Sequence, residues 1–183
     1  SGCGLSDGDF ADGSLTRWAE EAVALAEGLT DGPLVLVGSS MGGWLMLLVA
    51  LRLPHRVAGL VGIAPAPDFT QWGFDAAEQA HLAAGEVLLR PNEYGYEPTP
   101  THPLFWADGQ ASRLLDAPIP LTCPVRLLHG QADTVVPPAV SLQLADRLAG
   151  MDVQVTLVKD GDHRLSTPEH ITLLLRTVAA LIE

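Results

Sequence analysis

The sequence predicts an α/β fold, with a mostly parallel sheet and helices on both faces. Apolar stretches with the composition of buried strands alternate with stretches of helical periodicity along most of the chain. This alternation is typical of parallel sheets, in which a helix connects one strand to the next. The chain has 183 residues, of which 48% are hydrophobic, so it can bury a sizeable core. The expected strands cover residues 34–37, 57–63, 125–128 and 153–158.

The expected helices begin or end at recognisable residues. The first, over residues 15–29, is amphipathic and is closed by Gly32-Pro33. The second follows Ser40 and stops at Pro54, because proline removes a helical hydrogen bond and clashes with the preceding turn. Two further amphipathic helices follow the last two strands, over residues 140–148 and 169–182.

The turn between the first strand and the second helix carries a serine between two glycines. Gly38 lies two residues before Ser40 and Gly42 two residues after it, which is the G-x-S-x-G pattern between a strand and a helix. Such a turn exposes the serine Oγ, and the flanking glycines let the backbone pass close by without Cβ clashes. We therefore predict Ser40 as a nucleophile and the Met41 N–H, at the helix N-terminus, as an oxyanion donor. The alternative is a tight turn that only packs a helix on a sheet.

A nucleophilic serine needs a base and an acid, and two later strand ends supply candidates. Asp133 follows the strand at 125–128, and His163 follows the strand at 153–158. Ligands of open α/β sheets bind at this carboxyl edge, so we expect both side chains to approach Ser40. In that arrangement His163 takes the Ser40 proton and Asp133 holds the imidazole tautomer. The alternative is that both are surface-loop residues.

Other titratable residues are less suitable by their positions. His129 ends a strand, where a packed or hydrogen-bonded structural group is expected. Asp160 and Asp162 lie too close to His163 in sequence to orient its ring from behind. Asp133 therefore remains the preferred acid.

Three segments together resemble one branch of the α/β-hydrolases. They are residues 38–47, 118–130 and 162–164. The branch is that of the mitochondrial palmitoyl-protein thioesterases, also described as acyl-glucuronide esterases, and the likeness covers nearly the whole chain. The resemblance implies the α/β-hydrolase fold and serine hydrolysis of acyl thioesters or oxygen esters. It implies a substrate that is a small-molecule or acyl-protein ester.

The chain departs from that fold at its front. A complete α/β-hydrolase has several strands before the one that carries the serine, and a loop among them gives a second oxyanion N–H. Neither a strand nor such a loop precedes residue 34, so we expect a fold truncated at its N-terminal side. The strand at 34–37, whose composition predicts burial on both faces, is then left with one neighbour. We expect an N-terminal segment outside this chain, or a second copy, to cover that edge.

The stretch 68–116 interrupts the alternation and is expected to be a cap, or lid, inserted after the second strand. It separates two parts of the core, residues 1–67 and 117–183. Seven of the ten aromatic residues lie in it, and four of these are predicted to line an apolar substrate pocket: Trp72, Phe74, Phe105 and Trp106. The alternative is that the aromatic residues build the cap's own small core. All seven are Phe69, Trp72, Phe74, Tyr94, Tyr96, Phe105 and Trp106.

The charge balance limits the partners of the chain. A formal net charge of −12 and a pI near 4.7 argue against binding to nucleic acid or to an anionic membrane surface. The longest apolar run, residues 41–51, is about half of what a membrane span needs. No targeting segment is readable, and a cytoplasmic location is expected. Cys3 and Cys123 do not form a metal-ligand pattern, and neither a metal nor a cofactor is expected.

These inferences combine into a serine hydrolase that cleaves carboxylic esters or acyl thioesters through an acyl-enzyme. Two alternatives stay open. One is a peptidase or amidase that uses the same three residues. The other is a catalytically weak C-terminal fragment that acts as an interaction module, because the loss of one oxyanion donor costs about 10²–10³ in turnover.

Overall fold

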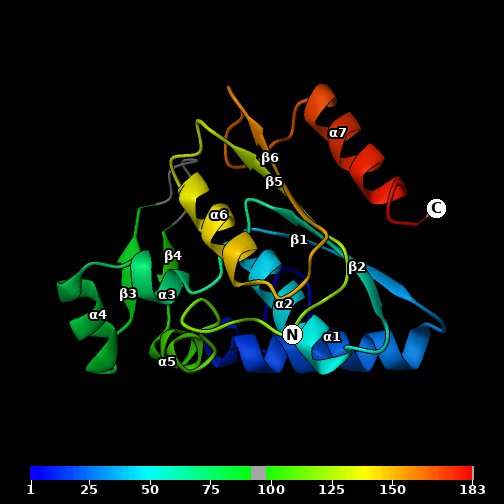
Figure 1. Cartoon of the computed structure of the whole chain (residues 1–183). Coiled ribbons are helices and arrows are strands. Elements are labelled where there is room, and N and C mark those ends of the chain that lie inside the picture. The colour runs from blue at the N-terminus through cyan, green and yellow to red at the C-terminus, as the bar shows by residue number, and fades with distance from the viewer. Residues whose placement is uncertain (92–97, 183) are drawn as a thin grey trace. The chain divides into compact units, whose positions relative to one another are not determined.

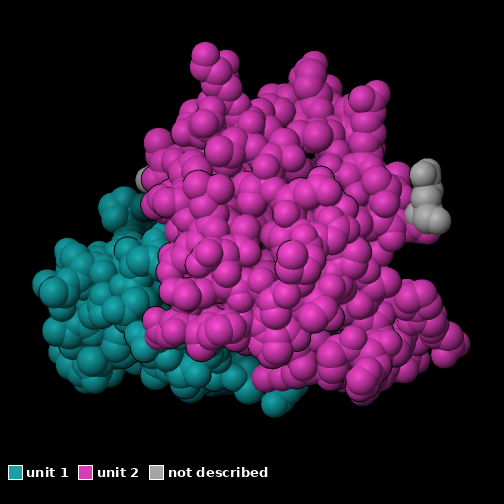
Figure 2. All heavy atoms as spheres, in the orientation of Figure 1, with its two compact units in different colours: residues 1–21, 68–113 teal, residues 22–67, 114–183 magenta. Residues whose placement is uncertain are grey.

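The computed structural model describes residues 1–91 and 98–182 (Figure 1). Its helices are η1 (Phe10–Asp12), α1 (Leu15–Leu29), α2 (Met41–Arg52), α3 (Phe69–Trp72), α4 (Ala76–Ala83), α5 (Pro103–Ala111), α6 (Pro138–Arg147) and α7 (Pro168–Ala179). Its strands are β1 (Leu34–Ser39), β2 (Val57–Ile63), β3 (Leu88–Arg90), β4 (Thr99–Thr101), β5 (Val125–Gly130) and β6 (Val153–Val158). Two compact units can be distinguished, residues 1–21 with 68–113 and residues 22–67 with 114–183, which are coloured separately in Figure 2.

The larger unit contains a parallel sheet with the strand order β1-β2-β5-β6. The four predicted strands are these four, and β1 and β5 each continue two residues further than predicted, to Ser39 and Gly130. In Figure 1, α2 and α6 lie on one side of the sheet and α7 lies on the other. The prediction of a parallel sheet with helices on both faces is therefore confirmed.

Burial in this unit is concentrated in the middle of the sheet and on α2 and α6. The central strands β2 and β5 are almost entirely buried, and Trp44, Leu47 and Leu144 are fully inaccessible on the two helices. α7 has no fully buried residue, although Leu173 and Leu174 pack against a small cluster at the carboxyl ends of the central strands. The carboxyl ends of the strands are thus held by packing on both faces.

The expectation that β1 is buried on both faces is wrong. Leu34, Val35 and Leu36 are only partly buried, and Val37 is 49% exposed. The reason is its position, because within the described residues β1 pairs with β2 alone and so forms an edge of the sheet. An apolar composition does not distinguish a central strand from an edge strand whose side chains are left open.

The smaller unit is held together by aromatic side chains and by a hydrogen bond from a backbone amide to a carboxylate. Trp18 lies 6.0 Å from Phe10 and 5.8 Å from Phe105, measured between ring centroids. The Thr16 N–H donates to Asp108 at 2.8 Å. Residues 1–21, which we had expected in the hydrolase core, are therefore grouped with residues 68–113 because α1 begins among these rings. This unit also holds the antiparallel pair β3–β4, which was not predicted.

Among the described residues, no helix combines the length and apolar character that a bilayer crossing requires.

Candidate active site

The turn that carries Ser40 is built by the ends of two neighbouring strands. β1 ends at Ser39, and α2 begins at Met41, so Ser40 alone makes the turn with φ 54° and ψ −124°. Its N–H donates to the carbonyl of Ile63 at 2.9 Å, and its own carbonyl accepts from the Ala66 N–H at 3.0 Å. A positive φ is rare for a residue with a Cβ, and these two backbone bonds hold it in place.

Close backbone approach explains one of the two flanking glycines. A Cβ on Gly38 would lie 2.3 Å from the carbonyl oxygen of Gly42, so only glycine fits there. The expectation for Gly42 itself is wrong, because a Cβ at that position meets no atom within 4 Å. The second tight position is Gly43 instead, where a Cβ would lie 2.5 Å from the Cβ of Pro65. The helix therefore approaches the sheet one residue later than the motif suggests.

Ser40, His163 and Asp133 are joined by hydrogen bonds. The Ser40 Oγ lies 3.0 Å from Nε2 of His163, and Nδ1 of the same ring lies 2.8 Å from Oδ2 of Asp133. Because a carboxylate only accepts, the neutral ring carries its proton on Nδ1 and leaves the Nε2 lone pair for the serine hydroxyl. The side chain of Asp133 is inaccessible, and that of His163 is 16% exposed. We refer to these three residues as the Ser-His-Asp triad.

The Asp133 carboxylate is oriented by its own loop. Oδ1 accepts from the backbone N–H groups of Val135 and Val136, at 2.8 and 2.9 Å. Oδ2 is left to face His163. A buried carboxylate needs donors to replace water, and the loop provides them through backbone amides that have no rotational freedom.

The loops that follow β5 and β6 are tied to each other. The Ala132 N–H donates to the carbonyl of Gly161 at 3.0 Å, and the Gln131 N–H donates to the carbonyl of Val158 at 2.8 Å. A Cβ on Gly130 would lie only 2.1 Å from the Gly161 oxygen. The acid and the base thus belong to loops in direct backbone contact.

The neighbouring aspartates have other positions, as expected. Asp162 Oδ1 accepts from the backbone N–H of Leu165 at 2.9 Å, which shapes the loop after His163 rather than the imidazole itself. Asp160 lies exposed in the turn before it. Met41 is the first residue of α2, where the N–H groups of a helix have no intrahelical partners, as an oxyanion donor requires. Its role as an oxyanion donor stays a prediction.

The four predicted pocket aromatics are placed in the smaller unit. Phe74 stacks with Phe69 at 6.3 Å, and Phe105 lies 5.8 Å from the same ring. Trp106 Nε1 donates to the carbonyl of Thr70 at 3.1 Å, and Trp72 ends α3. These contacts agree with the alternative of an internal core, and substrate contact by the four side chains stays a prediction. Tyr94 and Tyr96 lie outside the described residues.

His129 is a residue of the site that the sequence interpretation did not include. It was expected to be a hydrogen-bonded structural group, and its ring is indeed fully buried and bonded to Ser141 and Val136. In addition, its Nε2 lies 3.2 Å from Oδ2 of Asp133. The available signal was the four-residue spacing between His129 and Asp133 across a strand end.

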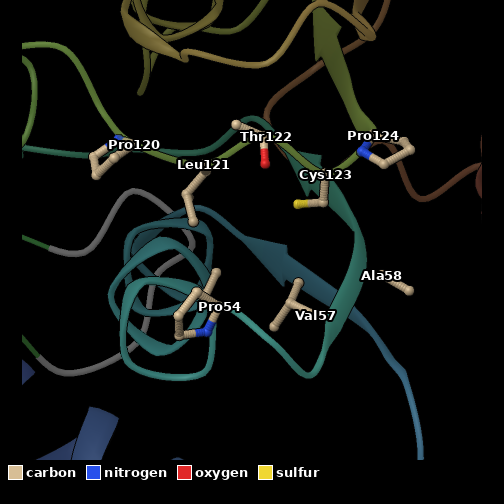
Figure 3. A pocket seen from close by; sticks show the side chains of 9 residues that line it. Pro54, Val57, Ala58, Pro120, Leu121, Thr122, Cys123 and Pro124 are labelled. Carbon is tan, nitrogen blue, oxygen red and sulfur yellow. The ribbon is translucent and has the colours of Figure 1, made fainter.

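Two cavities of the larger unit lie at opposite ends of the sheet. A cavity of about 300 Å³ lies at the amino ends, where Val57 begins β2 and Pro124 precedes β5, and Cys123 points into it (Figure 3). Burial raises the pKa of this thiol. The second cavity, of about 160 Å³, lies at the carboxyl ends beside Ser39 and Leu165. Of these two cavities, the smaller one is next to the Ser-His-Asp triad.

No group of three potential metal ligands occurs in residues 1–91 and 98–182.

The sequence matches the model of the prolyl oligopeptidase family, Peptidase_S9, over residues 15–183. The chain belongs to this family. It is also 42% identical over 189 residues to "Palmitoyl-protein thioesterase ABHD10, mitochondrial" of Mus musculus, in an alignment that covers 100% of this chain and 63% of that protein. The chain thus spans less than two thirds of the length of this relative.

Solved structures of two relatives are similar along the whole chain. A putative hydrolase from Agrobacterium vitis S4 gives a TM-score of 0.93 at 41% identity, and alpha/beta hydrolase domain-containing protein 10 from mouse gives 0.89 at 40%. Each comparison covers 100% of this chain and 74% of the other. The α/β-hydrolase fold and the resemblance to this branch are confirmed. The cytoplasmic location stays a prediction, since the name of the mouse relative places that protein in mitochondria.

Proposed function

We propose that the chain is a serine hydrolase that cleaves carboxylic esters or acyl thioesters through an acyl-enzyme. Ser40 is the nucleophile, His163 the general base and Asp133 the acid that orients it. The observation that carries this proposal is the pair of hydrogen bonds, 3.0 and 2.8 Å long, that joins the three side chains beside a strained turn.

The reaction follows from the positions of the protons. His163 Nε2 takes the hydroxyl proton as Ser40 Oγ attacks the acyl carbonyl, and the Met41 N–H donates to the oxyanion. His163 then gives the proton to the departing thiolate or alkoxide. Water, deprotonated by the same ring, attacks the acyl-enzyme, and the collapse of that intermediate releases the acid and restores the serine. Asp133 stabilises the imidazolium in both steps.

The substrate is proposed from the relatives. The mouse relative is named a palmitoyl-protein thioesterase, and another relative, 29% identical over 90% of this chain, is named a pimeloyl-[acyl-carrier protein] methyl ester esterase. Both names describe acyl groups carried on proteins. An acyl-protein ester or thioester is therefore the preferred substrate class, and a small-molecule acyl ester is the alternative.

The test combines covalent labelling with turnover. Intact mass after treatment with a fluorophosphonate should show one adduct on the wild-type chain and none on Ser40→Ala. Hydrolysis of a short p-nitrophenyl ester should be lost with the adduct. Ser39→Ala is the matched control and should keep most of both signals, because Ser39 is exposed and is not one of the three hydrogen-bonded side chains. Turnover retained by Ser40→Ala would contradict the proposal.

A peptidase or amidase is the second candidate, because the family model that matches the chain is that of prolyl oligopeptidases. An acyl thioester and a peptide p-nitroanilide compared on the same preparation would separate the two. Faster turnover of the anilide would favour the peptidase. Labelling of Ser40 with no turnover of either substrate would favour the weakly catalytic interaction module.

A further inference from the structure

The ring of His129 has hydrogen-bond partners on both nitrogens, although it is completely buried. It lies on β5, one residue before the end of the strand. Nδ1 lies 2.7 Å from Oγ of Ser141, a fully buried residue of α6. Nε2 lies 2.9 Å from the carbonyl oxygen of Val136 and 3.2 Å from Oδ2 of Asp133. A buried imidazole with this many partners has a defined orientation.

These partners determine which nitrogen carries the proton. The Val136 carbonyl and the Asp133 carboxylate are both acceptors, so Nε2 must be the donor. In the neutral ring Nδ1 then accepts, and the Ser141 hydroxyl donates to it. His129 and His163 are therefore opposite tautomers, and a ring nitrogen of each lies close to the same carboxylate oxygen, at 3.2 and 2.8 Å.

The Asp133 carboxylate thus has three hydrogen-bond donors and, in addition, a close contact with a second imidazole. Oδ1 accepts from the two backbone amides of its own loop, and Oδ2 accepts from His163. Nε2 of His129 lies 3.2 Å from the same Oδ2, while its hydrogen bond goes to the Val136 carbonyl. The bond to Val136 also lets His129 hold the loop that supplies one of the amides. The groups facing the His129 ring are the Asp133 carboxylate, the Val136 carbonyl and, from α6, the Ser141 hydroxyl.

We propose that His129 is a positioning residue of the active site, which fixes the Asp133 carboxylate and shares the negative charge of its Oδ2 with His163. It does not touch the substrate or the reacting atoms. This inference rests on the proposed function, since it concerns the strength of the Asp133–His163 bond during catalysis. Ser141 acts one step further out, by donating its hydroxyl to Nδ1 of the His129 ring.

The sign of the effect follows from the shared charge. Without the polar N–H of His129, whose nitrogen lies 3.2 Å from Oδ2, this oxygen keeps more negative charge for His163 and stabilises its imidazolium. The base is then protonated at a higher pH, so the acidic limb of the kcat/KM profile moves upward. The carboxylate also loses one constraint on its orientation, which lowers kcat. Substrate binding is unaffected, because His129 has no contact with the substrate.

The test compares His129→Phe, which keeps a ring without a donor, with His129→Gln, which keeps an N–H donor. His129→Phe should lower kcat about 10- to 100-fold with little change in KM, because it removes both the hydrogen bond to the Val136 carbonyl and the polar contact with the buried charge of Asp133. Its acidic limb should shift upward by about 0.5–1 pH unit. His129→Gln should recover part of both effects. Leu144→Ala is the matched control, because it removes a fully buried side chain of α6 that has no polar atom.

The control separates positioning from lost stability. Leu144→Ala should lower the melting temperature and leave the pH profile unchanged. If His129→Phe keeps the wild-type kcat and profile, or if Leu144→Ala moves the profile equally, the inference is wrong. Should His129→Phe fail to fold, the tautomer of the His129 ring in the wild-type chain decides, because that measurement needs no variant.

A second measurement is independent of activity. In ¹H–¹⁵N spectra of the wild-type chain, the His129 ring should be the Nε2–H tautomer, and a proton on Nδ1 would overturn the inference. Absence of fluorophosphonate labelling in the wild-type chain would instead contradict the proposed function. The tautomer assignment would still decide whether the proton of His129 lies on the nitrogen beside Asp133.

Discussion

Replacing Gly38 with alanine tests whether the turn geometry, rather than the presence of a serine, creates the site. The added Cβ would lie 2.3 Å from the Gly42 oxygen and 2.7 Å from the Gly42 carbonyl carbon. Both are backbone atoms, so the start of α2 must move away from β1 to accept the methyl group. Overpacking of this kind costs about 1–3 kcal/mol of unfolding free energy.

The same displacement affects turnover, because Ser40 lies between the two contacting segments. A shift of about 1 Å in a reacting group can cost about 10²-fold in rate. Moving Ser40 Oγ from its 3.0 Å distance to His163 should therefore lower kcat by about that factor. The loss of rate should exceed what the loss of folded protein explains at the assay temperature.

Gly42→Ala is the matched control, because the new Cβ meets no atom within 4 Å. Gly42 is a helical residue of α2, and alanine in place of glycine inside a helix gains about 0.5–1 kcal/mol. In urea unfolding, Gly38→Ala should therefore be less stable and Gly42→Ala more stable than the wild-type chain. Turnover of the p-nitrophenyl ester should fall in Gly38→Ala and not in the control. If Gly38→Ala keeps wild-type stability and turnover, the steric explanation of the turn is refuted.

Three further predictions concern the acid, an ion pair and the sheet edge. Asp133→Asn should fold normally and lower kcat by about 10²–10⁴, because the His163 tautomer is no longer enforced. Asp162→Asn should lower kcat much less, and equal losses in steady-state assays would contradict the assignment of Asp133 as the acid. The hydrogen bond from Arg90 lowers the pKa of Glu78 below its usual 4.5, so this pair stabilises the fold above that pH and is lost as the pH falls through the lowered value. Glu78→Gln should therefore lower the melting temperature at pH 7, by the equivalent of about 0.2–1 kcal/mol, and this loss should shrink as the pH falls below 4.5; a loss that grows in acid would contradict this sign. We also propose that a strand from outside this chain, or from a second copy, pairs with β1, so residues 1–183 should self-associate in light scattering and Val37→Lys should reduce that association; a monomeric wild-type chain would count against it.

The parallel sheet was predictable because each strand has a short apolar sequence bounded by turn residues. The candidate site was predictable for a related reason, since Asp133 and His163 directly follow strands whose carboxyl ends must share one edge. Local sequence therefore carried both the elements and the approximate place of the polar groups.

The remaining features depend on contacts between distant residues, which local sequence does not encode. The approach of Gly43 to Pro65 and the contact of His129 with Asp133 both arise from how one loop lies against another. The exposure of Val37 has the same origin, because among the described residues β1 has a neighbouring strand on one side only. Assignment of residues 1–21 required the ring contacts of Trp18, which no periodicity reveals.

The strained backbone of Ser40 implies a trade-off between activity and stability in this protein. A residue with a side chain at φ 54° and ψ −124° stores about 1–3 kcal/mol, which glycine would not. Ser40→Gly should therefore unfold at a higher temperature than Ser40→Ala, although both lack the nucleophile. The glycine variant is then the better choice for trapping an uncleaved acyl substrate. More generally, random mutagenesis scored for thermal resistance alone would be expected to favour loss of the serine, so selections for robust variants of this chain need a simultaneous demand for turnover.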